Sequence, residues 1–234
     1  MTEIRAYRPT DHDDVYRICV ETGDSGTDAT GLFRNDDLLP DIYAGPYLVH
    51  DPDLVLLVDD GDGAIGYVLG TADSAAYTEW FRTEWWPTVA DKYAASAASG
   101  SADVGPAGDA AAGPAGDAAA AADAAPAADG DSAPPVSERE ASIIASAADF
   151  ESAPADIVER YPAHLHIDLL PGTQGQGLGR QLIERFTEEL RERGVRGVHL
   201  GVDRRNTGAH RFYERTGFTR VGDPDGPVWY AKEL

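Results

Sequence analysis

A glycine-rich turn, residues 172–180, is the stretch whose residue types and spacing most directly indicate chemistry. An apolar strand pattern, residues 164–170, leads into it, and an amphipathic helix pattern, residues 178–193, follows it. Glycines at such a junction let the backbone approach a ligand closely, and the free N–H groups at the start of the helix attract an anion. The turn therefore predicts a binding site for a phosphate group.

Three phosphate-binding patterns compete for this turn. A nucleoside-triphosphatase loop requires Lys and then Ser or Thr after its last glycine, whereas Gly177 is followed by Leu and Gly. A dinucleotide fingerprint requires a third glycine at the position of Arg180, although Asp203 ends the next predicted strand, where an acidic residue would bind a ribose. The third pattern, Gln/Arg-x-x-Gly-x-Gly/Ala, is met in full by residues 174–179.

A candidate general base lies in the strand before the turn. His164, His166 and Asp168 alternate along the sequence and therefore share one face of that strand. A hydrolase metal site of this kind continues with another histidine where this chain has Leu169, so the metal interpretation is disfavoured. Asp168 is closest to the turn, and we predict that it acts as the base through a water molecule. Two alternatives stay open: a structural Asp168 held by backbone donors, and His166 as the base.

Two separated motifs resemble the GNAT family of N-acetyltransferases. The first is the turn itself, which is similar to the loop with which the family holds the pyrophosphate of coenzyme A. The second motif, "RRNTGAHRFYERTGF", looks like the family's N-x-x-A-x-x-F/Y-Y-x-x-x-G-F segment, with Asn206, Ala209, Phe212, Tyr213, Gly217 and Phe218 in register. Two other stretches, "ETGDSGTDATGLFRNDDLLPDIYAGPYL" and "TEWFRTEWWP", resemble a subgroup related to the acetyltransferase-like domain that accompanies O-GlcNAcase.

The resemblance implies a GNAT fold and direct transfer of an acetyl group from acetyl-CoA to a primary amine, without a metal. In this family the strand before the turn splays from the next strand. The backbone of residues 167–170 would then pair with the pantetheine arm, and an N–H near Leu169 or Leu170 would stabilise the oxyanion. The residues expected to bind the coenzyme are Leu169, Leu170, Gln174, Gly175, Gln176, Gly177, Leu178, Gly179, Arg180 and Asn206.

Two residues of the second motif have a functional and a structural interpretation. Tyr213 lies at the position of the family's tyrosine that donates a proton to the sulfur; the alternative is an aromatic ring that only packs. Asn206 would contact the coenzyme, but capping of the following helix alone would also explain an asparagine there.

The sequence does not identify the acceptor amine. A small metabolite, an antibiotic, a polyamine and a protein N-terminus are all compatible with it. The aromatic residues between positions 80 and 86 either line an acceptor pocket or, as is commoner, pack in the core. A catalytically inactive domain that only binds the coenzyme is the alternative to an enzyme.

The remaining pattern predicts a mixed α/β sheet in a single domain over residues 1–234. Residues 95–136 consist almost wholly of Ala, Gly, Asp, Ser and Pro, and we predict that they form a disordered insertion. Asp11 is expected to cap a helix that carries Val15, Ile18 and Cys19 on one side. Strands are expected at 3–8, 54–58, 65–70, 164–170, 197–203, 218–221 and 228–232. Further helices are expected at 156–161, 178–193 and 207–216, and over 74–93 a helix that is broken or ends near Pro87.

The formal charge of −22 comes from 27 Asp and 14 Glu against 17 Arg and 2 Lys. Such a surface disfavours nucleic acid as a partner. Asp in excess of Glu with almost no Lys resembles haloarchaeal proteins, so we expect a halophilic protein. The sequence lacks a signal-peptide pattern and any apolar run near the ~18 residues of a membrane span, so a cytoplasmic protein without a membrane partner is expected. A homodimer is among the oligomeric states that stay open.

Overall fold

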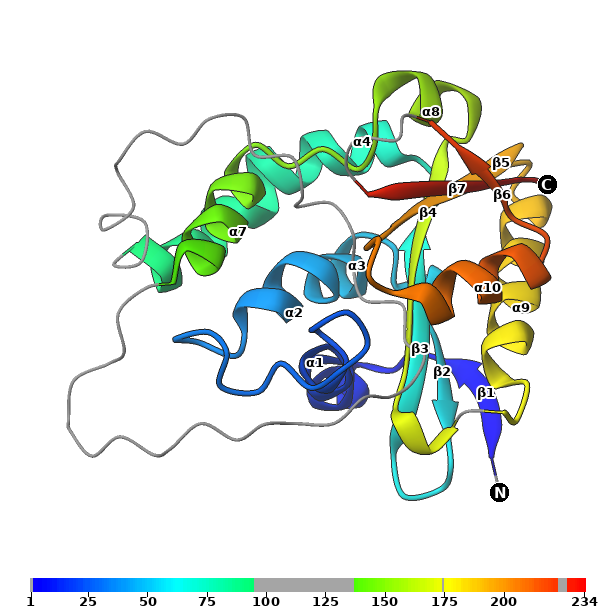
Figure 1. Ribbon diagram of the computed structural model, residues 1–234, viewed down its shortest axis with the longest axis horizontal. Coiled ribbons are helices and arrows are strands. Elements are labelled where there is room, and N and C mark those ends of the chain that lie inside the picture. The colour runs from blue at the N-terminus through cyan, green and yellow to red at the C-terminus, as the bar shows by residue number, and fades with distance from the viewer. Residues whose placement is uncertain (1, 95–136, 174, 223–226) are drawn as a thin grey trace.

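The computed structural model describes residues 2–94, 137–173, 175–222 and 227–234. Seven strands in this part of the chain form one mixed sheet in the order β1-β2-β3-β4-β5-β7-β6 (Figure 1). Neighbouring strands are antiparallel except β4 and β5, which are parallel. The strands are β1 (Glu3–Ala6), β2 (Leu56–Asp59), β3 (Ala64–Thr71), β4 (Ala163–Leu169), β5 (Gly197–Val202), β6 (Thr219–Val221) and β7 (Val228–Glu233).

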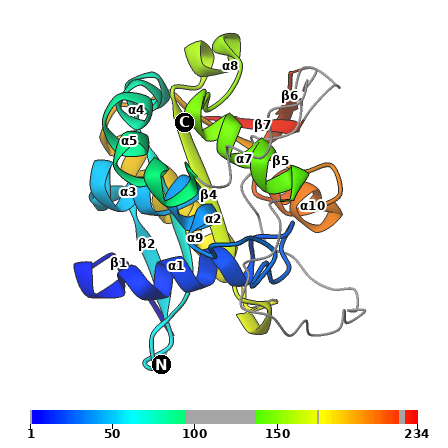
Figure 2. The ribbon, with the colours of Figure 1, turned by 90° about the vertical axis from the view of Figure 1, so that its left-hand side faces the viewer.

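Helices cover both faces of the sheet. Helices α9 and α10 lie on one side of the strands and α1, α2 and α3 on the other (Figures 1 and 2). None of the helices in the described ranges combines the length and the apolar content that a membrane span requires. The α-helices are α1 (His12–Glu21), α2 (Leu38–Tyr43), α3 (Gly45–His50), α4 (Ser74–Trp80), α5 (Trp86–Val89), α7 (Glu138–Ala148), α8 (Ala155–Arg160), α9 (Leu178–Glu192) and α10 (Thr207–Arg215).

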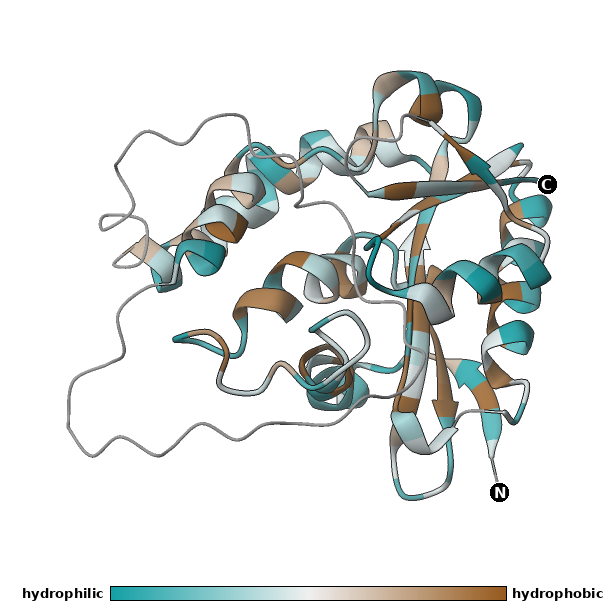
Figure 3. Cartoon of the chain, viewed as in Figure 1, coloured by the Kyte–Doolittle hydropathy of each residue, from teal (hydrophilic) through white to brown (hydrophobic). Residues whose placement is uncertain are grey.

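The core is split into two layers because side chains alternate along each strand. In β2, Leu56 and Val58 join the cluster that contains Phe186 of α9, whereas Leu57 joins the cluster that contains Val15 of α1. In Figure 3 the central strands are largely brown to white, and α9 and α10 carry much teal. Each helix therefore buries one apolar stripe against the sheet and keeps its polar side outward.

Strands β4 and β5 part soon after they begin. They pair only at Ala163↔Val198 and His164↔His199, although both strands continue. On its other edge β4 is paired with β3 along most of its length, from Thr71↔His164 to Gly66↔Leu169. The sheet therefore opens into a V between β4 and β5, as the family resemblance predicted, and the glycine turn follows the far end of β4.

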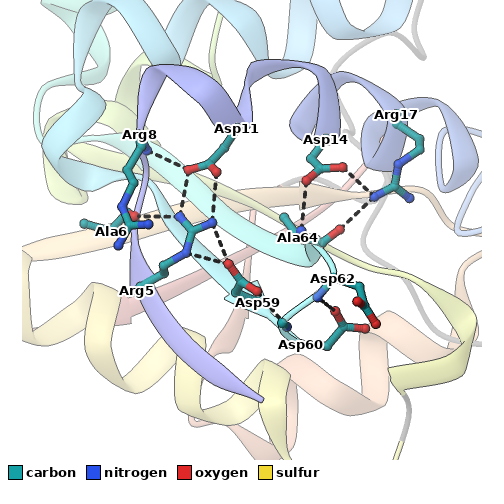
Figure 4. A network of polar contacts seen from close by, with 11 residues as sticks. Arg5, Ala6, Arg8, Asp11, Asp14, Arg17, Asp59, Asp60, Asp62 and Ala64 are labelled. Atoms are coloured by element: carbon teal, nitrogen blue, oxygen red, sulfur yellow. Dashed lines mark hydrogen bonds and ion pairs between the residues drawn. The ribbon is translucent and has the colours of Figure 1, made fainter. Parts of the chain in front are cut away.

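A network of ion pairs fixes the first helix to the sheet edge (Figure 4). Arg5 of β1 pairs with Asp11 at 2.7 Å and with Asp59 at the end of β2 at 2.7 Å. Asp11 occupies the N-cap position of α1 but its side chain makes no capping bond to that helix. Its carboxylate accepts instead from the backbone N–H of Arg8 at 2.7 Å. The prediction that the Asp11 side chain caps this helix is therefore wrong, because the carboxylate is held by the Arg5 guanidinium of the neighbouring strand.

Most predicted elements are present within about two residues of their expected ends, including α9 and α10. The predicted helix over 74–93 is instead divided into α4, a π-helical segment over Phe81–Trp85, α5 and a 3₁₀ segment over Ala90–Tyr93. Helices α2, α3 and α7 were not predicted from the sequence. For α7 a signal existed, since Ser137 accepts a bond from the N–H of Glu140 at 3.0 Å in an S-x-x-E pattern. The insertion predicted at 95–136 lies outside the described residues.

Candidate functional site

The backbone of β4 determines which groups face the V. Leu170 N–H donates to Ile65 O on β3 at 3.0 Å. In an antiparallel pair the backbone groups of successive residues point alternately toward and away from the partner. The N–H and C=O of Leu169 and Ile167 therefore point toward β5, where the two strands have parted. Of the two oxyanion donors expected from the sequence, Leu169 fits and Leu170 does not, because its N–H is already bonded.

The glycine turn adopts a backbone that favours glycine. Gly175 and Gly177 have φ of +76° and +74°, in the left-handed region. A Cβ at Gly172 or Gly175 would meet nothing within 4 Å, and one at Gly177 would only reach the flexible end of Gln181 at 4.0 Å. The turn therefore leaves open space at the start of α9, where the first N–H groups of a helix have no intrahelical partner. Gln174 lies outside the described residues.

The other predicted loop residues have different local surroundings. Leu178 packs in the core beneath the turn. A Cβ at Gly179 would lie 3.1 Å from Leu169 and 3.2 Å from Phe212, so this glycine lets α9 approach β4 and α10 closely. Arg180 is exposed and its guanidinium pairs with Glu184 at 2.7 Å. Gln176 is exposed, and its side-chain amide donates to the backbone oxygen at position 172 at 3.3 Å.

Asp168 is buried beneath the V, with 1% of its surface exposed. Tyr67, opposite it on β3, donates to Oδ2 at 2.5 Å, and Oδ1 has no partner in the described part of the chain. Burial raises the pKa of Asp168 to about 8, against the opposing effect of the Tyr67 hydrogen bond. In the described part of the chain a side-chain hydroxyl bonds to this carboxyl, and not the backbone donors that a structural role of Asp168 was expected to use.

Tyr213 lies on α10 and is 1% exposed. Its ring packs against Phe218 and Tyr230, with centroids 5.5 Å and 5.8 Å away. Burial, and then the charge of Asp168, raises the pKa of the Tyr213 hydroxyl well above its usual range. The hydroxyl therefore keeps its proton at neutral pH, as a proton donor must, while the ring also packs.

Asn206 caps α10, because its side-chain oxygen accepts from the N–H of Ala209 at 3.0 Å. The preceding turn is fixed by Asp203, which pairs with Arg205 at 2.7 Å. Ser25, from the segment after α1, donates to Asp203 at 3.0 Å. The bond with Arg205 lowers the pKa of Asp203 to about 2. These contacts tie the N-terminal segment to the loop between β5 and α10.

A pocket that was not predicted from the sequence lies where β4 and β5 part. Its walls include His164 and His166 of β4, His199 of β5, Tyr43 of α2 and Phe150. His164 and His166 alternate on one strand, but His199, Tyr43 and Phe150 lie far from them in the sequence. Among the described residues, no group of three His, Cys, Asp or Glu side chains is arranged to hold a metal ion.

The two histidines of β4 share one tyrosine. The Tyr47 hydroxyl of α3 lies 2.6 Å from Nε2 of His164 and 3.0 Å from Nε2 of His166. Ser74 Oγ lies 2.7 Å from Nδ1 of His164. Burial lowers the pKa of His166 to about 4 and that of His164 well below its usual range, so both rings are neutral at pH 7.

The tryptophan-rich segment serves the core. Phe81 and Trp86 are buried, and Trp80 and Trp85 pack against the same apolar cluster. Asp41 lies beneath them, and its backbone oxygen accepts from the Trp85 indole at 2.7 Å. The commoner of the two predicted uses of these aromatic residues is therefore confirmed.

Comparisons with known proteins agree with this geometry. A sequence model of the acetyltransferase (GNAT) family matches residues 143–218. The crystal structure of SsHAT has 33% identity and a TM-score of 0.76, over 99% of this chain and 98% of that one. Protein O-GlcNAcase of Rattus norvegicus is 23% identical over 225 residues, which are 95% of this chain and 20% of that protein. Mycothiol acetyltransferase of Beutenbergia cavernae is 51% identical over 51 residues, 22% of this chain and 17% of that protein.

The chain thus spans about a fifth of the length of the curated relatives it matches. The similarity to the GNAT family and to O-GlcNAcase confirms the two resemblances found in the sequence. The alternative of a catalytically inactive domain receives no support from these comparisons. A haloarchaeal origin stays a prediction.

Proposed function

This chain belongs to the GNAT family of acetyltransferases, and from that premise we propose that it transfers the acetyl group of acetyl-CoA directly to the nitrogen of a primary amine. The observation that carries the proposal is the parting of β4 and β5 directly before an open glycine turn. The V leaves backbone groups of one strand free for an extended ligand, and the turn offers the start of α9 to an anion.

The coenzyme's pyrophosphate would lie on Gly175, Gly177 and the first N–H groups of α9. Open space at both left-handed glycines supports this assignment, since a side chain there would occupy the ligand's volume. The N–H and C=O of Ile167 and Leu169 would bind the pantetheine arm. The Leu169 N–H would also stabilise the negative charge that develops on the carbonyl oxygen.

Proton transfer is assigned to Asp168 and Tyr213. The amine nitrogen forms a bond to the thioester carbonyl carbon while the carbon–sulfur bond breaks. One N–H proton passes through a water molecule to the ionised Asp168, and the Tyr213 hydroxyl protonates the sulfur. Return of that proton from Asp168 to Tyr213 restores both groups. Because the pKa of Asp168 is about 8, the fraction able to accept a proton increases as the pH rises toward that value.

Product analysis tests the proposal. The protein is incubated with acetyl-CoA carrying a ¹³C-labelled acetyl group and a panel of primary amines, and products are identified by mass spectrometry. We expect a labelled amide from at least one amine, together with an equal amount of free coenzyme A. Release of labelled acetate alone, or no binding of acetyl-CoA in calorimetry, would contradict the proposal.

A further inference from the structure

Tyr67 connects three elements through one buried hydroxyl. It lies on β3 directly opposite Asp168 on β4, and none of its surface is exposed. Its hydroxyl donates to Oδ2 of Asp168 at 2.5 Å, and it also interacts with the Cys19 thiol of α1. A phenol carries one proton, which Asp168 accepts, so the thiol can interact only with the Tyr67 oxygen. The hydroxyl therefore ties the carboxyl to both β3 and α1.

The Tyr67 bond determines which oxygen of Asp168 is left for a proton. Oδ2 already accepts from Tyr67. No hydrogen bond of normal geometry reaches Oδ1 from the described residues, although the Thr22 side chain acts on the carboxyl. The Thr22 hydroxyl donates to the Ile18 oxygen at 2.7 Å, so its proton is engaged within its own helix. Oδ1 is therefore the oxygen to which a proton can be added.

We propose that Tyr67 is a positioning residue of the acetyl transfer: it holds Oδ2 of Asp168, leaves Oδ1 to receive the amine proton, and stabilises the ionised carboxylate that receives it. This inference rests on the proposed function, in which Asp168 is the base. A hydroxyl that donates to a carboxylate favours its charged form. Without the hydroxyl, burial would keep the proton on Asp168 to a higher pH, and fewer molecules would hold a base at neutral pH.

The titratable groups around Asp168 are neutral at pH 7. Cys19 of α1, Tyr67 of β3 and Tyr213 of α10 are all affected by the charge of Asp168, and burial raises the pKa of each. Burial lowers the pKa of His166, on the same face of β4, to about 4. These four groups therefore contribute no positive charge that would stabilise the carboxylate. Of the two side chains that oppose the effect of burial on the pKa of Asp168, Tyr67 has the larger effect.

The pH dependence of the rate separates this role from packing. Tyr67→Phe keeps the buried ring and removes only the hydroxyl. With acetyl-CoA and n-butylamine, we expect kcat/KM of the variant to be roughly 10- to 100-fold below that of the parent at pH 6.5, because a hydrogen bond to a charged group is lost. The ratio of variant to parent should rise toward one by pH 10, where Asp168 ionises in both proteins. The ionisation of the amine itself cancels in this ratio.

Tyr93→Phe is the matched control. The Tyr93 hydroxyl is also buried and donates to a buried carboxylate, Oδ2 of Asp41, at 2.7 Å. This pair joins α2 to the 3₁₀ segment over Ala90–Tyr93 and does not include the proposed base. The ratio of Tyr93→Phe to the parent should therefore stay constant with pH. A constant ratio for Tyr67→Phe as well would show that its hydroxyl serves packing, and it would overturn the proposal.

A second measurement uses the unaltered protein and needs no turnover. With ¹³C-labelled tyrosine rings, the Cζ resonance of Tyr67 should follow the ionisation of Asp168, with a midpoint near pH 8. The same step should be absent in Asp168→Asn. A Tyr67 resonance that stays unchanged from pH 6 to 9.5 would overturn the proposal. The expected step in a protein that acetylates no amine would leave the coupling of Tyr67 to Asp168 standing and would contradict the proposed function instead.

Discussion

Tyr67 and Asp168 face each other across β3 and β4, and the Tyr67 hydroxyl donates to the Asp168 carboxyl at 2.5 Å. The side chain of Thr22 also acts on this carboxyl, and, like Tyr67, it opposes the effect of burial on the pKa. Burial outweighs the effects of Tyr67 and Thr22, so the pKa of Asp168 rises to about 8. The folded protein therefore holds a proton here that the unfolded chain has lost at neutral pH.

Asp168→Asn should alter how stability depends on pH. The unfolded carboxyl ionises near pH 4, but the folded one ionises near pH 8. The stability contributed by protonated Asp168 is thus fully present below about pH 4 and is lost as the pH rises to 8, by at most about 1.4 kcal/mol per pH unit. Urea unfolding of both proteins from pH 4.5 to 9 should show the variant gaining on the parent up to pH 8. A constant difference across this range would contradict the raised pKa.

Gly177→Glu should abolish coenzyme A binding while the protein stays folded. The added carboxylate would project into the open space where two phosphates are proposed to bind. Calorimetric titration with coenzyme A measures the loss, and circular dichroism checks the fold. Gly194→Glu is the matched control, because Gly194 also has a left-handed φ, of +73°, and an open Cβ position, but it follows the opposite end of α9. Equal loss in both variants would point to backbone strain and not to the turn.

Tyr213→Phe should lower kcat by roughly 10²- to 10⁴-fold, with coenzyme affinity little changed. The variant keeps the ring that packs against Phe218 and removes only the hydroxyl that is proposed to protonate the sulfur. Steady-state rates with an identified acceptor, paired with a coenzyme titration, measure the effect. Tyr230→Phe removes a neighbouring hydroxyl that lies 3.2 Å from His210, and it should be nearly silent. Near-parental turnover of Tyr213→Phe would remove this residue from the mechanism.

The melting temperature should rise steeply between low and molar KCl. Repulsion among carboxylates in a chain of formal charge −22 is screened when the Debye length falls to roughly 3 Å near 1 M salt. Thermal melts across a KCl series measure the rise. The same series near the sequence pI of about 4.4 should show a smaller rise, because many carboxylates are then protonated. A flat or falling curve at pH 7 would leave the halophilic prediction without support.

Deletion of residues 95–136 should change the melting temperature little and leave coenzyme affinity unaltered. The segment has no aromatic residue and no Lys or Arg, so it can contribute little to a core. Differential scanning calorimetry and a coenzyme titration of the shortened chain measure both quantities. A large loss in either would show that the segment stabilises the rest of the chain.

Local rules in the sequence determined the elements that carry the proposed coenzyme site. The spacing of Leu182, Phe186 and Leu190 defines one apolar stripe on α9, and glycines before it mark the turn. Asn206 lies three residues before the N–H that it caps. Short-range signals of this kind act within one or two helical turns, so they can be read without knowledge of the fold. The short helices α2 and α3 were missed because six residues give too little periodicity to distinguish a helix.

Only the tertiary structure decided which groups face the V between β4 and β5. The bond from Leu170 to Ile65 fixes which residues of β4 direct their backbone groups toward β3. A shift of one residue would have turned the N–H of Leu170 toward the V in place of that of Leu169. His199 likewise lines the pocket because it lies opposite His164 and bonds to Tyr161. Sheet register and the packing of distant helices set these relationships. They join elements that no local spacing connects, so the sequence determined the glycine turn while the fold determined the pocket between β4 and β5.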